Sequence, residues 1–422
     1  MSPDRSAVAI QTDRHDAWQS FALGVIGDAA LSAEFAAIKD AGAFVDEAVR
    51  HARARGIALC AADLRHVREP DPLGIARWVD APLTGSALPP RDWLPVSVTP
   101  TPNEIVVDWA RFGPEPLREP FFEDSLRRAL SQPFNRAFRY RTGLHDLVAQ
   151  HQTTESLTPS GFIFHMSRCG STLVAQMLAA LPDSIVISEA APIDAVVQLA
   201  RGHSGDDAIR ALQAMIAAFG RKRGGRERRY VVKLDCWHTL ALPLFRRAFP
   251  DVPWVFLYRD PVEVLVSQMR QRGMQMVPQF LPPSVYGIAP GDILLDEDYC
   301  ARVLAAVCQA VIDHHDLSGQ HVSGQDLSGG HFLNYRHLPD AVYSTILDHF
   351  GISCSEAERD KMRLATRQNA KSPSLPFAGD SDEKQRAAPP ALRRAAEQHL
   401  GAIYRRLEAM MQAASVKRGA VS

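Results

Sequence analysis

The stretch GFIFHMSRCGSTLVAQMLAAL, residues Gly161–Leu181, decides the predicted fold of this chain. It begins with the apolar run Phe162–Phe164, which is typical of a buried parallel strand. A tight polar turn, His165–Gly170, follows, and apolar residues then recur from Ser171 at the spacing of one helix face. This succession of strand, turn and helix predicts an anion-binding cradle, because free N–H groups and the dipole at a helix N-terminus favour negative charge.

The residues of the turn narrow the kind of anion. Arg168 supplies a fixed positive charge, and Ser171 and Thr172 supply hydroxyl donors, so we predict a phosphate-binding loop. The common nucleotide-triphosphatase loop requires G-x-x-x-x-G-K-[ST], whereas His165–Thr172 has one glycine and no lysine. An ATPase or an ordinary kinase is therefore disfavoured.

Further strand-and-helix units follow the loop. Apolar runs of strand length occur at Ser184–Ser188, Tyr230–Leu234 and Trp254–Tyr258, each followed by a helical pattern. They predict an α/β fold of three layers, α/β/α, with a central parallel sheet similar to that of P-loop-containing nucleotide hydrolases. Ligands in such sheets bind beyond the carboxyl ends of the strands. The polar residues expected there are Arg168, Glu189, Lys233, Asp235 and Arg259.

Length and composition bound the remaining possibilities. The 422 residues suggest two or three domains, and a net charge of −1 gives no global reason to expect nucleic acid as a partner. No run approaches the ~18 apolar residues of a membrane span, and the N-terminus lacks the apolar core of a signal peptide. Six scattered cysteines without a C-x-x-C favour reduced thiols in a cytoplasmic protein and no metal site.

We predict three parts of the chain. Residues 1–66 form a small helical domain, residues 67–157 a proline-rich linker and arm with a short strand and a helix, and residues 158–415 the α/β domain. The spaced apolar residues from Trp18 to Leu64 resemble the leader-like domain first noted near nitrogen-fixation genes. That resemblance implies contact with a protein or peptide partner, whereas the spacing alone fits an accessory helical bundle.

Two stretches are rich in basic residues, and each has two possible interpretations. Phe134–Tyr140 alternates aromatic and basic residues, which fits a nucleotide surface or, as we favour, aromatics packed inward with solvated arginines. Arg221–Arg229 is a dense basic loop, which we interpret as a solvated charge run rather than a docking surface for an acidic partner.

The loop resembles the 5′-phosphosulfate loop of sulfotransferases, [PY]-[KR]-S-G-[ST]-[ST]. Arg168 stands for the basic residue, Cys169 replaces the serine, and Gly170, Ser171 and Thr172 match the remainder. A thiol is a poorer donor than a hydroxyl, so Cys169 is a departure from the pattern.

A second motif of the same family occurs later in the chain. RDPVEVLVS places Ser267 eight residues after Arg259, as in the sulfotransferase site for the 3′-phosphate. Lys384 and Arg386, before the last helix, are weaker candidates for the same phosphate. The resemblance implies 3′-phosphoadenosine-5′-phosphosulfate as the co-substrate, a small-molecule or peptide acceptor, and no required metal.

The resemblance also implies the catalytic residues. Lys233 matches the lysine that relatives place at this strand end, where it would neutralise the leaving oxygen. Glu189 lies 21 residues after Arg168, the spacing of the base in the tyrosylprotein and bacterial branches. Asp235 occupies the position of the histidine base of the cytosolic eukaryotic branch, so Asp235 and His238 remain alternatives.

The acceptor and the activity itself leave alternatives open. Gly273–Gly291 is an apolar segment that suits either a lid over a hydrophobic or aromatic alcohol or ordinary core packing. A nucleotide-dependent phosphotransferase of the same fold, or a module that binds a nucleotide or peptide without catalysis, would also fit the pattern.

Overall fold

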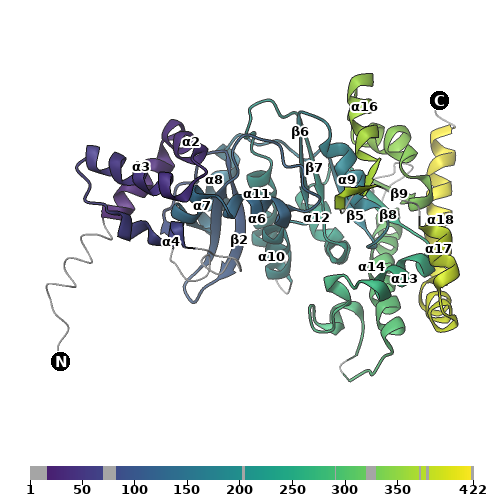
Figure 1. Ribbon diagram of the computed structural model, residues 1–422. Helices are drawn as coiled ribbons and strands as arrows, with labels where there is room; N and C mark the ends of the chain where they lie inside the picture. The colour runs from purple at the N-terminus through teal and green to yellow at the C-terminus, as the bar shows by residue number, and fades with distance from the viewer. Residues whose placement is uncertain are drawn as a thin grey trace.

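The computed structural model describes residues 17–69, 82–201, 205–289, 291–319, 329–369, 372–376 and 380–419. It confirms an α/β protein with a parallel sheet. Within the described residues there are sheets with the strand orders β6-β7-β5-β8-β9, β1-β4-β3-β2 and β10-β11. Figure 1 shows the N-terminal helices α2 and α3 at one end of the molecule and the C-terminal helix α18 at the other. The predicted three-layer arrangement and its likeness to P-loop hydrolases stay predictions.

The five-stranded sheet is parallel at every pairing, as the apolar runs predict. Its central strand β5 pairs with β7 on one side and with β8 on the other. The carboxyl ends of all five strands therefore meet at one edge. The strands are β5 (Gly161–His165), β6 (Ser184–Ser188), β7 (Arg229–Lys233), β8 (Trp254–Tyr258) and β9 (Gly330–Asn334).

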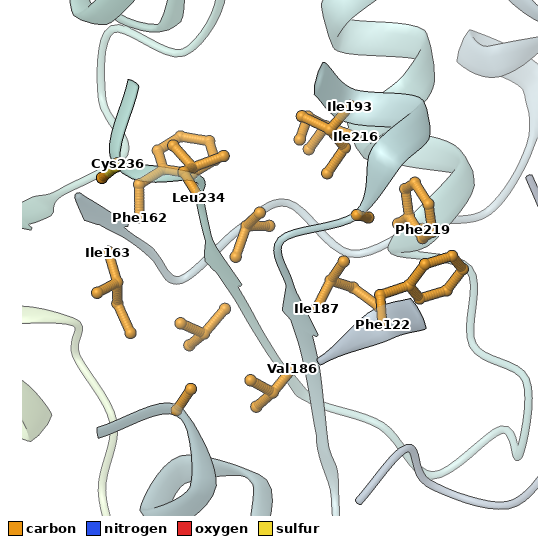
Figure 2. Packing of buried hydrophobic residues seen from close by; sticks show 14 of the residues in the cluster. Phe122, Phe162, Ile163, Val186, Ile187, Ile193, Ile216, Phe219, Leu234 and Cys236 are labelled. Carbon is orange, nitrogen blue, oxygen red and sulfur yellow. The ribbon is translucent and has the colours of Figure 1, made fainter. Parts of the chain in front are cut away.

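Helices follow these strands and cover their apolar side chains. Figure 2 shows Ile187 of β6 near Phe122 of α6 and Phe219 of α11, and Phe162 of β5 near Leu234, all within one cluster of buried residues. Every residue of β5, β6 and β8 is buried, which explains their unbroken apolar runs. The helices after the strands are α9 (Ser171–Ala179), α10 (Ala191–Ala200), α11 (Asp206–Phe219), η3 (Cys236–Ala241), α12 (Leu242–Ala248) and α13 (Pro261–Arg270).

The C-terminal part adds helices around the sheet, and the long helices α14 and α18 contact each other. Its elements are η4 (Met274–Met276), η5 (Pro283–Tyr286), α14 (Asp296–Gly319), η6 (Tyr335–His337), η7 (Val342–Ile346), α15 (Leu347–His349), α16 (Glu356–Ala365), β10 (Gln368–Asn369), β11 (Ser372–Pro376), α17 (Ser381–Ala387) and α18 (Pro390–Gly419).

The N-terminal part is helical, with Gly56 at φ +72° after its longest helix. Its buried aromatic residues pack on Phe138, which contacts Phe21, Phe35 and Phe44. These are contacts within the chain and give no support to the predicted partner contact. The helices are Ala17–Gly27, α2 (Ala29–Ala37), α3 (Ala41–Ala54), η1 (Ala61–Leu64) and α4 (Arg65–Arg68).

Among the residues that the structure describes, no single helix has the length and apolar composition to cross a membrane. The pair Ala17–Gly27 and α2 passes together by length and composition, with a bend of 101° between its members.

The proline-rich region is more regular than we predict from its composition. Trp93–Pro100 forms β2, an edge strand paired with β3, which the composition does not predict, while the division into a linker and arm stays a prediction. Edge strands tolerate proline because one side of the strand needs no ladder hydrogen bonds, and the register shifts between Pro95 and Ser97. Neighbouring elements are β1 (Leu83–Thr84), β3 (Ile105–Arg111), α6 (Phe122–Leu130), α7 (Pro133–Ala137), β4 (Tyr140–Gly143), α8 (Leu144–Gln150) and η2 (His151–Thr153).

The basic loop is not a solvated charge run throughout. Arg221 and Arg223 are only 4% and 5% exposed. They donate to the carbonyl oxygens of Pro89 and Gly113, which precede these two arginines by 132 and 110 residues. Two guanidinium groups therefore tie the loop to the proline-rich region. Phe134, Phe138 and Tyr140 are buried, as favoured for the aromatic stretch.

Candidate active site

The turn after β5 is shaped by left-handed backbone conformations. Ser167, Arg168 and Gly170 have φ of +85°, +52° and +86°. The buried His165 sets the first of these turns, because its Nδ1 accepts from the Ser167 N–H at 3.1 Å and its Nε2 donates to the Leu234 carbonyl at 2.9 Å. His165 therefore joins the loop to the end of β7, a role that the sequence analysis missed.

Gly170 allows the close approach of another segment. A Cβ atom there would lie 2.7 Å from Leu338 Cδ1 and 2.8 Å from Tyr335 Cδ2, and the positive φ also favours glycine. Ser171 and Thr172 follow as the first residues of α9. The unpaired N–H groups of this first helical turn are the anion donors that the sequence predicts.

Cys169 points away from the loop surface. It is fully buried, its Sγ–H donates to the Leu257 carbonyl at 3.1 Å, and burial raises the pKa of the thiol to about 11. The side chain thus packs between the loop and β8, and only its backbone N–H remains for an anion. A thiol suits this position because its one hydrogen bond is directed into the core.

The Arg168 side chain lies toward α13. Its Nη2 donates to the Gln271 carbonyl at 2.6 Å, directly after that helix, and burial lowers the pKa of the guanidinium. Arg168 therefore ties the loop to the start of the Gly273–Gly291 segment in this conformation. Its predicted phosphate contact stays a prediction.

Glu189 and Lys233 are brought together, as their strand-end positions predict. They form an ion pair in which the Lys233 side chain is completely buried and Glu189 is 24% exposed. Lys233 Nζ also lies 3.4 Å from Thr172 Oγ1 and 4.8 Å from the centre of the Phe121 ring. Glu189 has φ +53° and donates its N–H to the Lys233 carbonyl at 2.8 Å. The cation therefore stands between the proposed base and the first turn of α9.

Charges around the pair decide its protonation. Burial alone raises the pKa of Glu189, but the Lys233 charge and the hydrogen bond from His165 outweigh it and lower the pKa. For Asp235, burial and the nearby Glu189 and Asp194 carboxylates raise the pKa well above its usual range. Glu189 is thus an ionised carboxylate, and Asp235 is the weaker acid of the two.

His238 is hydrogen-bonded to a different carboxylate, that of Asp194. Its Nε2 donates to Asp194 Oδ1 at 2.9 Å, and Trp237 Nε1 donates to the same oxygen at 2.7 Å. Its ring is 1% exposed, and its role as an alternative base stays a prediction. Asp194, Asp235 and His238 place possible metal-ligand atoms within 4.8 Å of one another, a grouping that the sequence analysis did not find. The hydrogen bonds to Asp194 account for the position of that carboxylate.

Arg259 is surrounded by polar partners at the end of β8. Its Nε donates to Glu263 at 2.5 Å and its Nη2 to Asp380 at 2.7 Å, while the guanidinium lies 3.9 Å from the Tyr335 ring centre. Lys384 is brought to the same place through Asp380, at 2.6 Å. Ser267 is half-buried two turns along α13, and Arg386 is exposed.

The Gly273–Gly291 segment is connected to the loop by glutamines that the sequence analysis missed. The Ser167 hydroxyl accepts from Gln268 Nε2 and from Gln275 Nε2, both at 3.0 Å. Further along the segment, Phe280 is 39% exposed and its ring packs against Trp237, with 5.4 Å between centroids. The predicted lid therefore lies beside the loop within the described residues, and its role stays a prediction.

Three solved sulfotransferase structures resemble the chain distantly. Sulfotransferase STF9 from Mycobacterium avium has a TM-score of 0.35 and 11% identity, covering 61% of this chain and 81% of its own. The sulfotransferase domain of the curacin biosynthetic pathway has a TM-score of 0.34 and 13% identity, covering 59% and 99%. That of the Synechococcus PCC 7002 olefin synthase has a TM-score of 0.32 and 17% identity, covering 58% and 88%.

No protein-family model matches the chain, and no curated protein matches it.

Proposed function

We propose that this chain is a sulfotransferase, which transfers the sulfuryl group of 3′-phosphoadenosine-5′-phosphosulfate to a hydroxyl or amine acceptor. The observation that carries the proposal is the arrangement at one sheet edge. Four neighbouring strands end at this edge. β5 leads into the glycine-dependent loop and the N-terminus of α9, β6 and β7 end at the Glu189–Lys233 pair, and β8 ends at Arg259. Together they offer donors for two phosphate groups and a buried pair suited to proton and charge transfer.

In the proposed reaction the acceptor oxygen or nitrogen attacks sulfur in line with the leaving group. The bond from sulfur to the bridging oxygen breaks as the bond to the acceptor forms. The Lys233 ammonium stabilises the negative charge that develops on the bridging oxygen. The Glu189 carboxylate takes the acceptor proton, since it is the ionised carboxylate beside Lys233.

The remaining residues bind the nucleotide. Backbone N–H groups of Cys169 and Gly170, with the hydroxyls of Ser171 and Thr172, would bind the 5′-phosphate, and Arg168 would add charge. Arg259 and Ser267 would bind the 3′-phosphate. The missing loop lysine disfavours a triphosphate, and this second phosphate site favours a donor with a 3′-phosphate.

Isothermal titration with 3′-phosphoadenosine-5′-phosphate and with ATP tests the proposal. We expect the 3′-phosphorylated nucleotide to bind more tightly, and ATP binding of equal strength would refute the assignment. Glu189→Gln should abolish sulfuryl transfer to a broad acceptor panel, with nucleotide affinity within a few fold of wild type. Mass spectrometry of sulfated metabolites and peptides from the host, with and without the gene, would identify the acceptor.

A further inference from the structure

The cations predicted for the 3′-phosphate are already bridged by a carboxylate of the chain itself. Asp380 Oδ1 accepts from Arg259 Nη2 at 2.7 Å, and Asp380 Oδ2 pairs with Lys384 Nζ at 2.6 Å. Each oxygen thus holds one cation, which is the way a phosphate oxygen pair would contact them. Arg259 and Lys384 are almost completely buried, at 5% exposed each. An anion that binds both cations therefore has few positions available other than the one that the Asp380 carboxylate occupies.

The Asp380 carboxylate has no other structural task among the described contacts. It precedes α17, but its side chain makes no capping hydrogen bond to that helix. The neighbouring Ser381 hydroxyl accepts from Arg259 at 3.1 Å and donates to Glu263 at 2.9 Å. Attraction to Arg259 and Lys384 outweighs partial burial and lowers the pKa of Asp380, so this carboxylate is ionised near neutral pH.

The charges in this group are already balanced, so an additional anion would be unfavourable. Two cations, Arg259 and Lys384, face two carboxylates, Glu263 and Asp380. A phosphate entering among them would place three anionic groups around two cations. Glu263 is held on α13 with a side chain 11% exposed, whereas the Asp380 side chain is 43% exposed. Asp380 is therefore the carboxylate that can turn out to water.

We propose that Asp380 occupies the place of the 3′-phosphate on Arg259 and Lys384, and that a donor must displace this carboxylate in order to bind. Asp380 thereby sets the affinity for 3′-phosphorylated nucleotides and couples the position of α17 to donor occupancy. The inference rests on the proposed function, because it takes Arg259 as the 3′-phosphate site.

Isothermal titration of the full chain with two nucleotides tests this inference. One probe is 3′-phosphoadenosine-5′-phosphate, and the other is adenosine 5′-phosphate, which lacks the 3′-phosphate. Asp380→Asn should bind the first at least about tenfold more tightly than wild type, since a neutral amide competes poorly for two cations. Its affinity for adenosine 5′-phosphate should change less than twofold.

Asp382→Asn is the matched control, because it removes the same charge from an exposed residue of α17, two positions after Asp380. It should leave both affinities close to wild type. Unchanged or weaker binding of the 3′-phosphorylated nucleotide to Asp380→Asn, in a variant with a wild-type unfolding curve, would overturn the inference while leaving the proposed function intact. If wild type and Asp380→Asn both bind the two nucleotides equally well, the 3′-phosphate site itself fails, and the proposed function fails with it.

Discussion

Replacing Lys233 with methionine should destabilise the protein by leaving Glu189 without its cation. Methionine keeps most of the apolar stem of the completely buried lysine, so the change mainly removes charge. Removing one partner of a buried ion pair costs about 3–5 kcal/mol, because the other charge stays buried and unpaired. Glu189 is 24% exposed, which places the expected loss near the lower limit, about 3 kcal/mol.

The pH dependence of the loss follows from the direction of the pKa shift. In wild type the pKa of Glu189 is lowered from 4.5, so its ionised form stabilises the fold above that value, and this contribution is lost as the pH falls further. Without Lys233, the burial of Glu189 is offset by His165 alone, so the pKa of this carboxyl is higher than in wild type, and the variant regains stability relative to wild type when the carboxyl is protonated. The stability gap between wild type and variant should therefore narrow as the pH falls from neutrality toward the ordinary pKa of a glutamate.

Urea unfolding at neutral and mildly acidic pH measures both effects. The double variant Lys233→Met/Glu189→Gln should recover to within about 1 kcal/mol of wild type, because it buries no unpaired charge. Lys222→Met is the matched control: its partner Glu155 is 75% exposed, so the unfolding midpoint should hardly move. A loss below about 1 kcal/mol for Lys233→Met, or a gap independent of pH, would refute the buried pair.

Two further predictions concern buried side chains away from this pair. Brief alkylation of the native protein with iodoacetamide should label the exposed Cys60 and spare the buried Cys169, whose pKa is raised to about 11. Mass spectrometry detects the labelled residues, and early labelling of Cys169 would contradict its burial. Phe138→Ala should cost about 3–5 kcal/mol and speed proteolysis within the N-terminal helices, because its ring packs on four aromatic residues there. Phe280→Ala, at a 39% exposed site, serves as the control, and equal effects would argue against that packing.

The sequence predicts the strands well for a physical reason. A parallel strand buried on both faces is apolar whatever its neighbours are, so the runs at β5, β6, β7 and β8 are visible without knowledge of strand order. Since every such strand ends at the same sheet edge, the meeting of Glu189 with Lys233 follows from their positions alone. Edge strand β2 escapes prediction because its prolines are tolerated only through its place in the sheet.

What the sequence does not reveal is where each long side chain turns. Arg168 bonds to the Gln271 carbonyl 103 residues away, and Arg259 to Asp380 121 residues away. Such contacts depend on how remote segments pack, and no local pattern records them. The same holds for the buried arginines of the basic loop, whose carbonyl partners lie in the proline-rich region. A motif can therefore indicate which residues a site contains, but it does not show which of them are already engaged.

Because Glu189 and Lys233 are already paired in the free protein, the pairing itself would affect how they act in sulfuryl transfer. In the free protein Lys233 lowers the pKa of Glu189, so the carboxylate is ionised but a weak base. On the proposed mechanism the bridging oxygen of the donor competes for the same ammonium as negative charge develops on it. As Lys233 turns toward that oxygen, the burial of Glu189 is offset by His165 alone, and the affinity of the carboxylate for a proton rises. Glu189 would thus become a stronger base at the same stage of the reaction at which Lys233 stabilises the leaving oxygen. Movement of the one lysine would couple proton removal to departure of the leaving group.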